Sequence, residues 1–70
     1  MEWSDLNDQQ YFHTLRTMEE MGGSFVHNLG KAWIHADSFN RDRLEKAFPD
    51  MVDRFGPPSS LYLNKESVWE

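Results

Sequence analysis

Hydrophobic residues recur with a helical period in the stretch 39–56, FNRDRLEKAFPDMVDRFG. Successive apolar positions lie three or four residues apart and charged residues fill the positions between them, as in a helix that buries one face. The apolar positions are Leu44, Ala47, Phe48, Met51, Val52 and Phe55. Pro49 lacks the amide hydrogen that a continuous helix would need at that point. The pattern therefore predicts two helices, 38–48 and 49–55, which meet at a bend and present one apolar stripe to a common core.

Local signals mark the ends of these two helices. Asp37 directly precedes the first of them, and its side-chain oxygen can accept the free amide hydrogens of a first turn. Gly56 and the two prolines after it are typical stop signals. Asp42 and Lys46 are four residues apart, a spacing that favours an ion pair along the exposed side of the helix.

A helix is also predicted over 5–21, with an apolar stripe that begins at Tyr11. Asn7 and Gln10 have the spacing of a capping box, in which each side chain accepts the other residue's amide hydrogen. The pair Gly22-Gly23 should end this helix with a left-handed turn, because glycine adopts that conformation without a steric penalty.

The next helix is predicted over 24–36, with Ser24 as its cap and a broad apolar face that includes Trp33. Gly30 lies inside this helix, where glycine costs about 1 kcal/mol relative to alanine. The close approach of another backbone or ring would explain a glycine at this position, and sequence drift would explain it equally well.

The segment 59–70, SSLYLNKESVWE, is ambiguous. Leucines alternate with Tyr62, which indicates a short strand or an extended arm. Trp69 is unusual for a free tail, since disordered ends carry few apolar residues, so we expect the arm to dock on its own domain or on a second copy. The predicted fold is a small all-α bundle of three to four short helices over 1–58, followed by this extended C-terminal arm.

Size and composition suggest a need for partners. A chain of 70 residues forms one domain and buries only about 60% of its unfolded surface. It has no cysteine, which excludes disulfides and thiolate metal sites. Small domains without such staples often gain stability from a partner or from oligomerisation. Trp3, Trp33 and Trp69 supply much ring surface for one small core, so one of them in an interface is as reasonable an expectation as all of them buried.

The formal net charge is −5, which disfavours both nonspecific nucleic-acid binding and attachment to an anionic membrane. The first third of the chain is the acidic part, and Arg16 is its one basic side chain. Its acids are Glu2, Asp5, Asp8, Glu19 and Glu20. Such an end could meet a basic partner or imitate nucleic-acid phosphates, although ordinary solubility explains it more simply. No apolar run reaches the roughly 18 residues of a membrane span, and the acidic start lacks a signal-peptide pattern, so we expect a cytoplasmic protein.

Catalysis and metal binding find little support in the residue pattern. His27 and His35 are eight positions apart, too far along a helix to chelate one ion without tertiary help. Asp37 lies close to His35 in sequence, yet its capping role already explains it. The serines fall at turns, where serine is common. We therefore predict no enzymatic activity, no metal and no cofactor.

A helix-turn-helix DNA-binding protein is the main alternative, because short helices meet here at tight corners. The basic and amide residues that could read DNA are Asn40, Arg41, Arg43 and Lys46. Asp42 and Glu45 lie between them and would repel phosphates, so a solvated charged face accounts for the cluster better.

The stretch 22–57 resembles short proteins of tailed bacteriophages and prophages and covers about half of the chain. The resemblance is carried by GGSF at Gly22 to Phe25, Ala32-Trp33, Ala36-Asp37, Asn40 through Leu44, AFPD at Ala47 to Asp50, and Phe55-Gly56. It implies a phage or prophage origin and the cytoplasm of an infected bacterium. It implies no activity, so no functional residue is transferred from it.

These observations predict a small non-enzymatic phage-type protein that acts by protein–protein interaction. It would modulate or inhibit a host protein or defence system, or associate with itself as a homodimer. The predicted interaction surface combines the acidic first helix with aromatic and apolar positions: Glu2, Asp5, Asp8, Glu19, Glu20, Trp33, Tyr62, Leu63 and Trp69.

Overall fold

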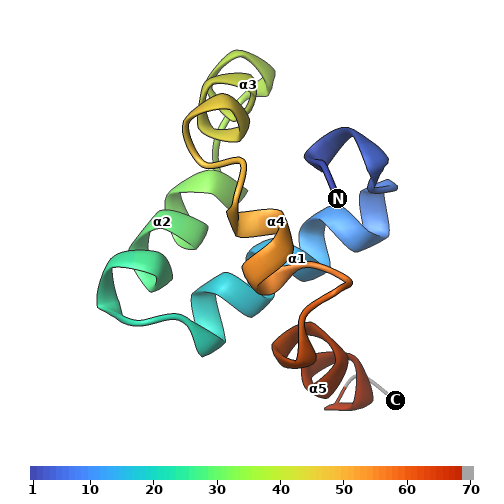
Figure 1. Ribbon diagram of the computed structural model, residues 1–70. Coiled ribbons are helices and arrows are strands. Elements are labelled where there is room, and N and C mark those ends of the chain that lie inside the picture. The colour runs from blue at the N-terminus through green and yellow to red at the C-terminus, as the bar shows by residue number, and fades with distance from the viewer. Residues whose placement is uncertain (69–70) are drawn as a thin grey trace.

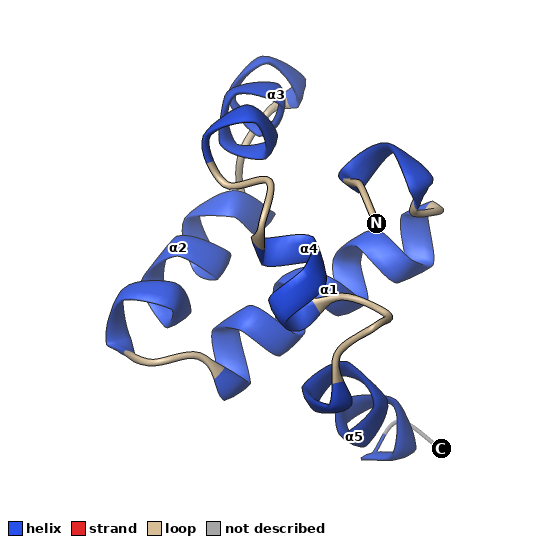
Figure 2. Cartoon of the chain, in the orientation of Figure 1, coloured by secondary structure: helices blue, strands red, loops and turns tan. Residues whose placement is uncertain are grey.

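The computed structural model describes the backbone of residues 1–68 and the side chains of residues 1–64. Over these residues the chain is helical and contains no strand (Figures 1 and 2), which confirms the predicted small all-α fold. The elements are η1 (Trp3–Asp5, a short 3-10 helix), α1 (Asp8–Met21), α2 (Ser24–Ile34), α3 (Ser38–Ala47), α4 (Met51–Phe55) and α5 (Ser60–Val68).

The start of α1 follows the predicted capping box. The Gln10 amide donates to Asn7 Oδ1 at 2.8 Å, and the Asn7 amide donates to Gln10 Oε1 at 3.0 Å. Because the capping residue Asn7 must be extended, the regular helix begins at Asp8, three residues later than predicted. The preceding residues form the separate η1 turn instead.

The corner between α1 and α2 differs from the prediction. Gly22 has φ −82° and ψ 163°, so the prediction of a left-handed turn at the paired glycines is wrong. Gly22 is needed for space, because a Cβ there would lie 2.5 Å from Val26 Cγ1 and 2.7 Å from the Met18 carbonyl oxygen. Ser24 is also not the cap: Gly23 holds that position without a side-chain hydrogen bond, and Ser24 is the first residue of α2.

Helices α1 and α2 cross closely at Gly30. A Cβ on this buried glycine would lie 3.0 Å from the Leu15 carbonyl oxygen and 3.1 Å from the Glu19 amide nitrogen. These are backbone atoms of α1, so the close approach of another backbone explains Gly30.

The pattern over 39–56 separates into two unlike helices. Helix α4 buries Met51, Val52 and Phe55, as predicted. Helix α3 buries no side chain, so the prediction that both helices share one buried stripe is wrong for α3. Leu44 and Phe48 reach the edge of the core and are half-buried, Arg41 and Glu45 are also partly covered, and the other side chains of α3 are exposed.

The predicted ends of α3 are confirmed. The Asn40 amide donates to Asp37 Oδ1 at 2.8 Å, so Asp37 caps the helix. At the other end α3 stops at Ala47, before Pro49, and α4 begins only after its cap residue Asp50. Asp42 and Lys46 form the expected ion pair at 3.0 Å on the exposed side of α3.

Aromatic rings form the centre of the core. The Trp3 ring centroid lies 4.7 Å from that of Trp33 and 5.2 Å from that of Tyr11. The Trp3 indole N–H donates to the Phe48 carbonyl oxygen at 3.1 Å. The short η1 turn therefore closes one side of the core with a ring and also provides a hydrogen bond to the α3–α4 connection.

Tyr11 connects three helices through its hydroxyl group. Tyr11 Oη donates to Glu45 Oε2 of α3 at 2.6 Å and accepts from Trp33 Nε1 of α2 at 2.9 Å. The Arg41 guanidinium lies 5.1 Å from the Tyr11 ring centroid. Burial and the hydrogen bond to Glu45 raise the pKa of Tyr11 far above its ordinary value, because both favour the neutral hydroxyl.

Replacing Tyr11 with phenylalanine should lower the free energy of unfolding by about 1–3 kcal/mol, because it leaves the Glu45 carboxylate and the Trp33 N–H without their partner. It should also change the pH dependence. An unfolded tyrosine loses its proton near pH ~10, whereas folded Tyr11 keeps it, so stability should fall as pH rises above about 10. Urea titrations at about pH 8 and about pH 10.5 should show a smaller fall for Tyr11→Phe than for the wild type. Equal falls in the two proteins would contradict this assignment.

The segment after the prolines is the largest departure from the sequence prediction. The expected extended arm is wrong over 60–68, where the chain forms α5. Ser59 starts this helix: its hydroxyl accepts the Leu61 amide hydrogen at 3.1 Å and its carbonyl accepts that of Leu63 at 3.2 Å. The buried Tyr62 ring stacks on His13 of α1, with 4.0 Å between centroids. Helix α5 therefore docks on α1 (Figure 1).

Candidate interaction surface

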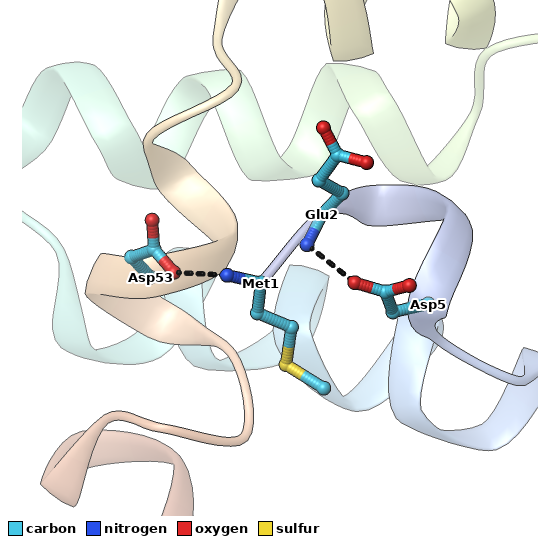
Figure 3. A network of polar contacts seen from close by, with 4 residues as sticks. All are labelled: Met1, Glu2, Asp5 and Asp53. Carbon is cyan, nitrogen blue, oxygen red and sulfur yellow. Dashed lines mark hydrogen bonds and ion pairs between the residues drawn. The ribbon is translucent and has the colours of Figure 1, made fainter.

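The predicted acidic surface is divided between the two ends of α1. Glu2 caps η1 and Asp5 is the last residue of that turn, and the Glu2 amide donates to Asp5 Oδ2 at 2.8 Å (Figure 3). Asp8 is the first residue of α1, and Glu19 and Glu20 lie in its last turn. Eleven residues separate Asp8 from Glu19, or roughly 16 Å along a helix. The five acids therefore do not form one continuous patch.

Asp53 adds a further acid near the first of these groups. Its Oδ1 lies 3.2 Å from the Met1 amino group, an ion pair that links the start of the chain to α4 (Figure 3). Asp5 is likewise occupied by the Glu2 amide. The acids around η1 thus support local structure, which reduces the case for a surface that imitates nucleic-acid phosphates.

The predicted aromatic positions do not form a surface either. Trp33 is 0% exposed and Tyr62 is buried, so both belong to the core of this chain. Assigning them to an interaction surface was wrong, because their ring contacts are already made inside the domain. Leu63 is 55% exposed and points away from that core on α5. Trp69 lies outside the described residues.

An open groove runs between α2 and α3, and the sequence prediction missed it. Its lining residues are Ala32, His35, Ala36, Asn40, Arg43, Leu44 and Ala47. The Phe25 ring at the start of α2 lies 6.3 Å, centroid to centroid, from Phe48 at the end of α3. The groove lies beside the carboxyl end of α2 and the connection that follows it, and its α3 positions run from Asn40 to Ala47.

Two exposed phenylalanines flank this groove. Phe25 is 63% exposed and Phe39 is 70% exposed, and they lie at opposite ends of the α2–α3 pair. The Arg43 guanidinium lies 5.7 Å from the Phe39 ring centroid. Exposed rings next to an open groove are typical of contact surfaces, since aromatic side chains and arginine provide much of the binding energy at protein interfaces. We call the groove and these two rings the α2–α3 surface.

The charge of the α2–α3 surface is opposite to that of the whole chain. Arg43 and His35 line the groove, and no aspartate or glutamate does. The chain as a whole carries −5. Asp42 and Glu45 of α3 are engaged elsewhere, in the ion pair with Lys46 and the hydrogen bond from Tyr11. The groove is therefore a locally basic and apolar feature on an acidic protein.

One sequence signal could have indicated this surface. Phe39 lies five positions before Leu44, so it is out of phase with the stripe of three- and four-residue steps that faces the core. The apolar stripe in the sequence starts at Leu44, and Phe39 lies outside it. The groove itself had no such signal, because the pattern over 24–36 indicated only a broad apolar face that includes Trp33.

The structure offers no constellation for metal chemistry within its described part. Residues 1–68 contain no group of three or more His, Cys, Asp or Glu side chains that could hold a metal ion. His27 Nδ1 lies 2.5 Å from the Glu19 carbonyl oxygen, which gives that ring a structural contact. Within the same residues, no helix combines the length and the apolar character that crossing a membrane requires. Comparisons of the chain with protein-family models, with curated proteins and with solved structures find no match.

Proposed function

We propose that this chain is a small non-enzymatic interaction module whose α2–α3 surface binds another protein. The observation that carries the proposal is the pair Phe25 and Phe39, which flank an open groove and are more than half exposed. Covering two such rings removes apolar surface from water at about 25 cal/mol per Å². A folded domain of this size gains nothing for its own stability from leaving them exposed.

The resemblance to short phage and prophage proteins supports a specific setting. In an infected bacterium the partner would be a host protein, and binding would modulate or inhibit that protein or a defence system. The rings are available for this role, because both are more than half exposed on the folded chain.

A photo-crosslinking experiment tests the proposal. We expect p-benzoyl-phenylalanine placed at position 39 or 25 to give a protein adduct of defined mass in a lysate of the bacterial host. Gln9 is exposed on α1, away from the groove, and is the control position. An adduct with twice the mass of the chain would identify a second copy as the partner. No adduct at positions 39 and 25, or an equal yield at position 9, would rule out the α2–α3 surface as the binding site.

A further inference from the structure

The groove has a floor of small and apolar side chains. Ala32 lies near the end of α2 and Ala36 in the connection that follows it, and Leu44 and Ala47 line the groove from α3. Small side chains allow another backbone to approach closely, since the distance between packed helix axes depends on the side chains at the contact. On α3 the lining positions run from Asn40 to Ala47, which at ~1.5 Å per residue is about 10 Å, or roughly two helical turns.

The polar groups of the groove select for negative charge. Arg43 can donate several N–H groups to a carboxylate, and His35 and the Asn40 amide add further donors along the same lining. Among the described residues, no carboxylate forms an ion pair with Arg43, whose guanidinium rests beside the Phe39 ring. The Arg43 guanidinium is therefore available to pair with a carboxylate of a partner at the edge of the groove.

We propose that the α2–α3 groove binds an amphipathic helix of a partner protein, with acidic residues beside its apolar stripe. The stripe packs on Ala32, Ala36, Leu44 and Ala47, and the acids meet Arg43 and His35. This inference rests on the proposed function and specifies the chemistry of the partner.

Two other occupants fit the groove less well. Nucleic acid would place phosphates over an apolar floor and close to Asp42, on a chain of net charge −5. A second copy of the chain carries the same net charge of −5, so the two copies repel each other at long range. Its helix α1 is also a poor ligand, because Tyr11, Leu15 and Met18 of that helix are buried in the core of their own chain.

The test uses two synthetic helix-stabilised peptides of about 12 residues, or roughly three helical turns. Both carry the same leucine–alanine stripe; one has glutamates beside it and the other has lysines at the same positions. We expect the acidic peptide to bind the full chain about tenfold more tightly than the basic one in fluorescence anisotropy, because opposite charges meet at Arg43. Amide signals of the alanines in the groove should shift in NMR spectra when it binds.

Charge-reversal variants identify the responsible cation. Arg43→Glu should weaken the binding of the acidic peptide about tenfold, because it replaces an attraction by a repulsion, and the basic peptide should then bind more tightly than the acidic one. Arg16→Glu, at an exposed position of α1, makes the same charge change away from the groove and should leave the preference for the acidic peptide unaltered. Circular dichroism confirms that both variants are folded, and Arg43→Gln gives a milder change at the same position.

The outcomes separate this inference from the proposed function. The proposal of an acidic helix as partner is wrong if the two peptides bind equally or if the two charge reversals have equal effects. It is also wrong if duplex DNA displaces the acidic peptide, or if the chain forms a dimer held together through Arg43. If adducts still form at position 39, the interaction module stands with a different occupant. If neither adduct nor peptide binding is found, both proposals fail.

Discussion

Replacing Trp33 with alanine should lower the free energy of unfolding by about 3–5 kcal/mol. Trp33 is 0% exposed, its ring lies 4.7 Å from Trp3 and 6.4 Å from Phe48 between centroids, and its indole N–H donates to Tyr11. Truncating a buried aromatic costs about 3–5 kcal/mol. A domain of 70 residues has a total stability of roughly 4–10 kcal/mol. One substitution therefore removes about half or more of the stability.

Urea unfolding followed by far-ultraviolet circular dichroism measures this effect. Trp33→Phe keeps a ring in place and should cost less, about 1–2 kcal/mol, since it loses volume and one hydrogen bond. Leu63→Ala is the control, because Leu63 is exposed and should change stability by no more than about 0.5 kcal/mol. If Trp33→Ala unfolded at the same urea concentration as Leu63→Ala, the assignment of Trp33 to the core would be wrong.

Replacing Gly30 with leucine should also be severely destabilising. Helix propensity alone gives the opposite sign, since leucine is better than glycine in a helix interior by nearly 1 kcal/mol. A Cβ at this position, however, already lies 3.0 Å from the Leu15 carbonyl oxygen and 3.1 Å from Met18 Cβ. A whole leucine side chain would force α1 and α2 apart, and overpacking of this kind costs about 1–3 kcal/mol or more.

Gly23→Ser is the matched control for this prediction. A Cβ at Gly23 would have no atom within 4 Å, and the residue caps α2, where serine is as good as glycine or better. Differential scanning calorimetry should show a melting temperature near that of the wild type for Gly23→Ser and a clear loss for Gly30→Leu. A rise in melting temperature for Gly30→Leu would mean that α1 and α2 are less closely packed than the structure indicates.

The helix ends were predictable because their causes are local. Asn7 with Gln10, and Asp37 with Asn40, form hydrogen bonds across three residues, so the sequence contains both partners in one short window. Pro49 acts in the same way, since a missing amide hydrogen breaks a helix wherever the chain goes next. These signals placed α1 to α4 to within a few residues.

The exposure of side chains was harder to predict because it depends on where whole helices go. Trp33 and Tyr62 were expected at an interface, but α1 packs against both of them. The alternation around Tyr62 was interpreted as a strand period. In a helix only two turns long, that alternation also arises by chance, and Ser59 provides a helix start. The groove needs two helices in a particular arrangement, so neither helix alone could indicate it.

The lack of buried side chains on α3 has an evolutionary consequence. Surface substitutions away from special contacts usually change stability by less than about 0.5 kcal/mol, and most of α3 consists of such positions. Selection for a new partner could therefore alter Phe39 or Arg43 while the core around Trp33 stays unchanged. The helix is a part of the protein where recognition can diverge rapidly between relatives without loss of the fold.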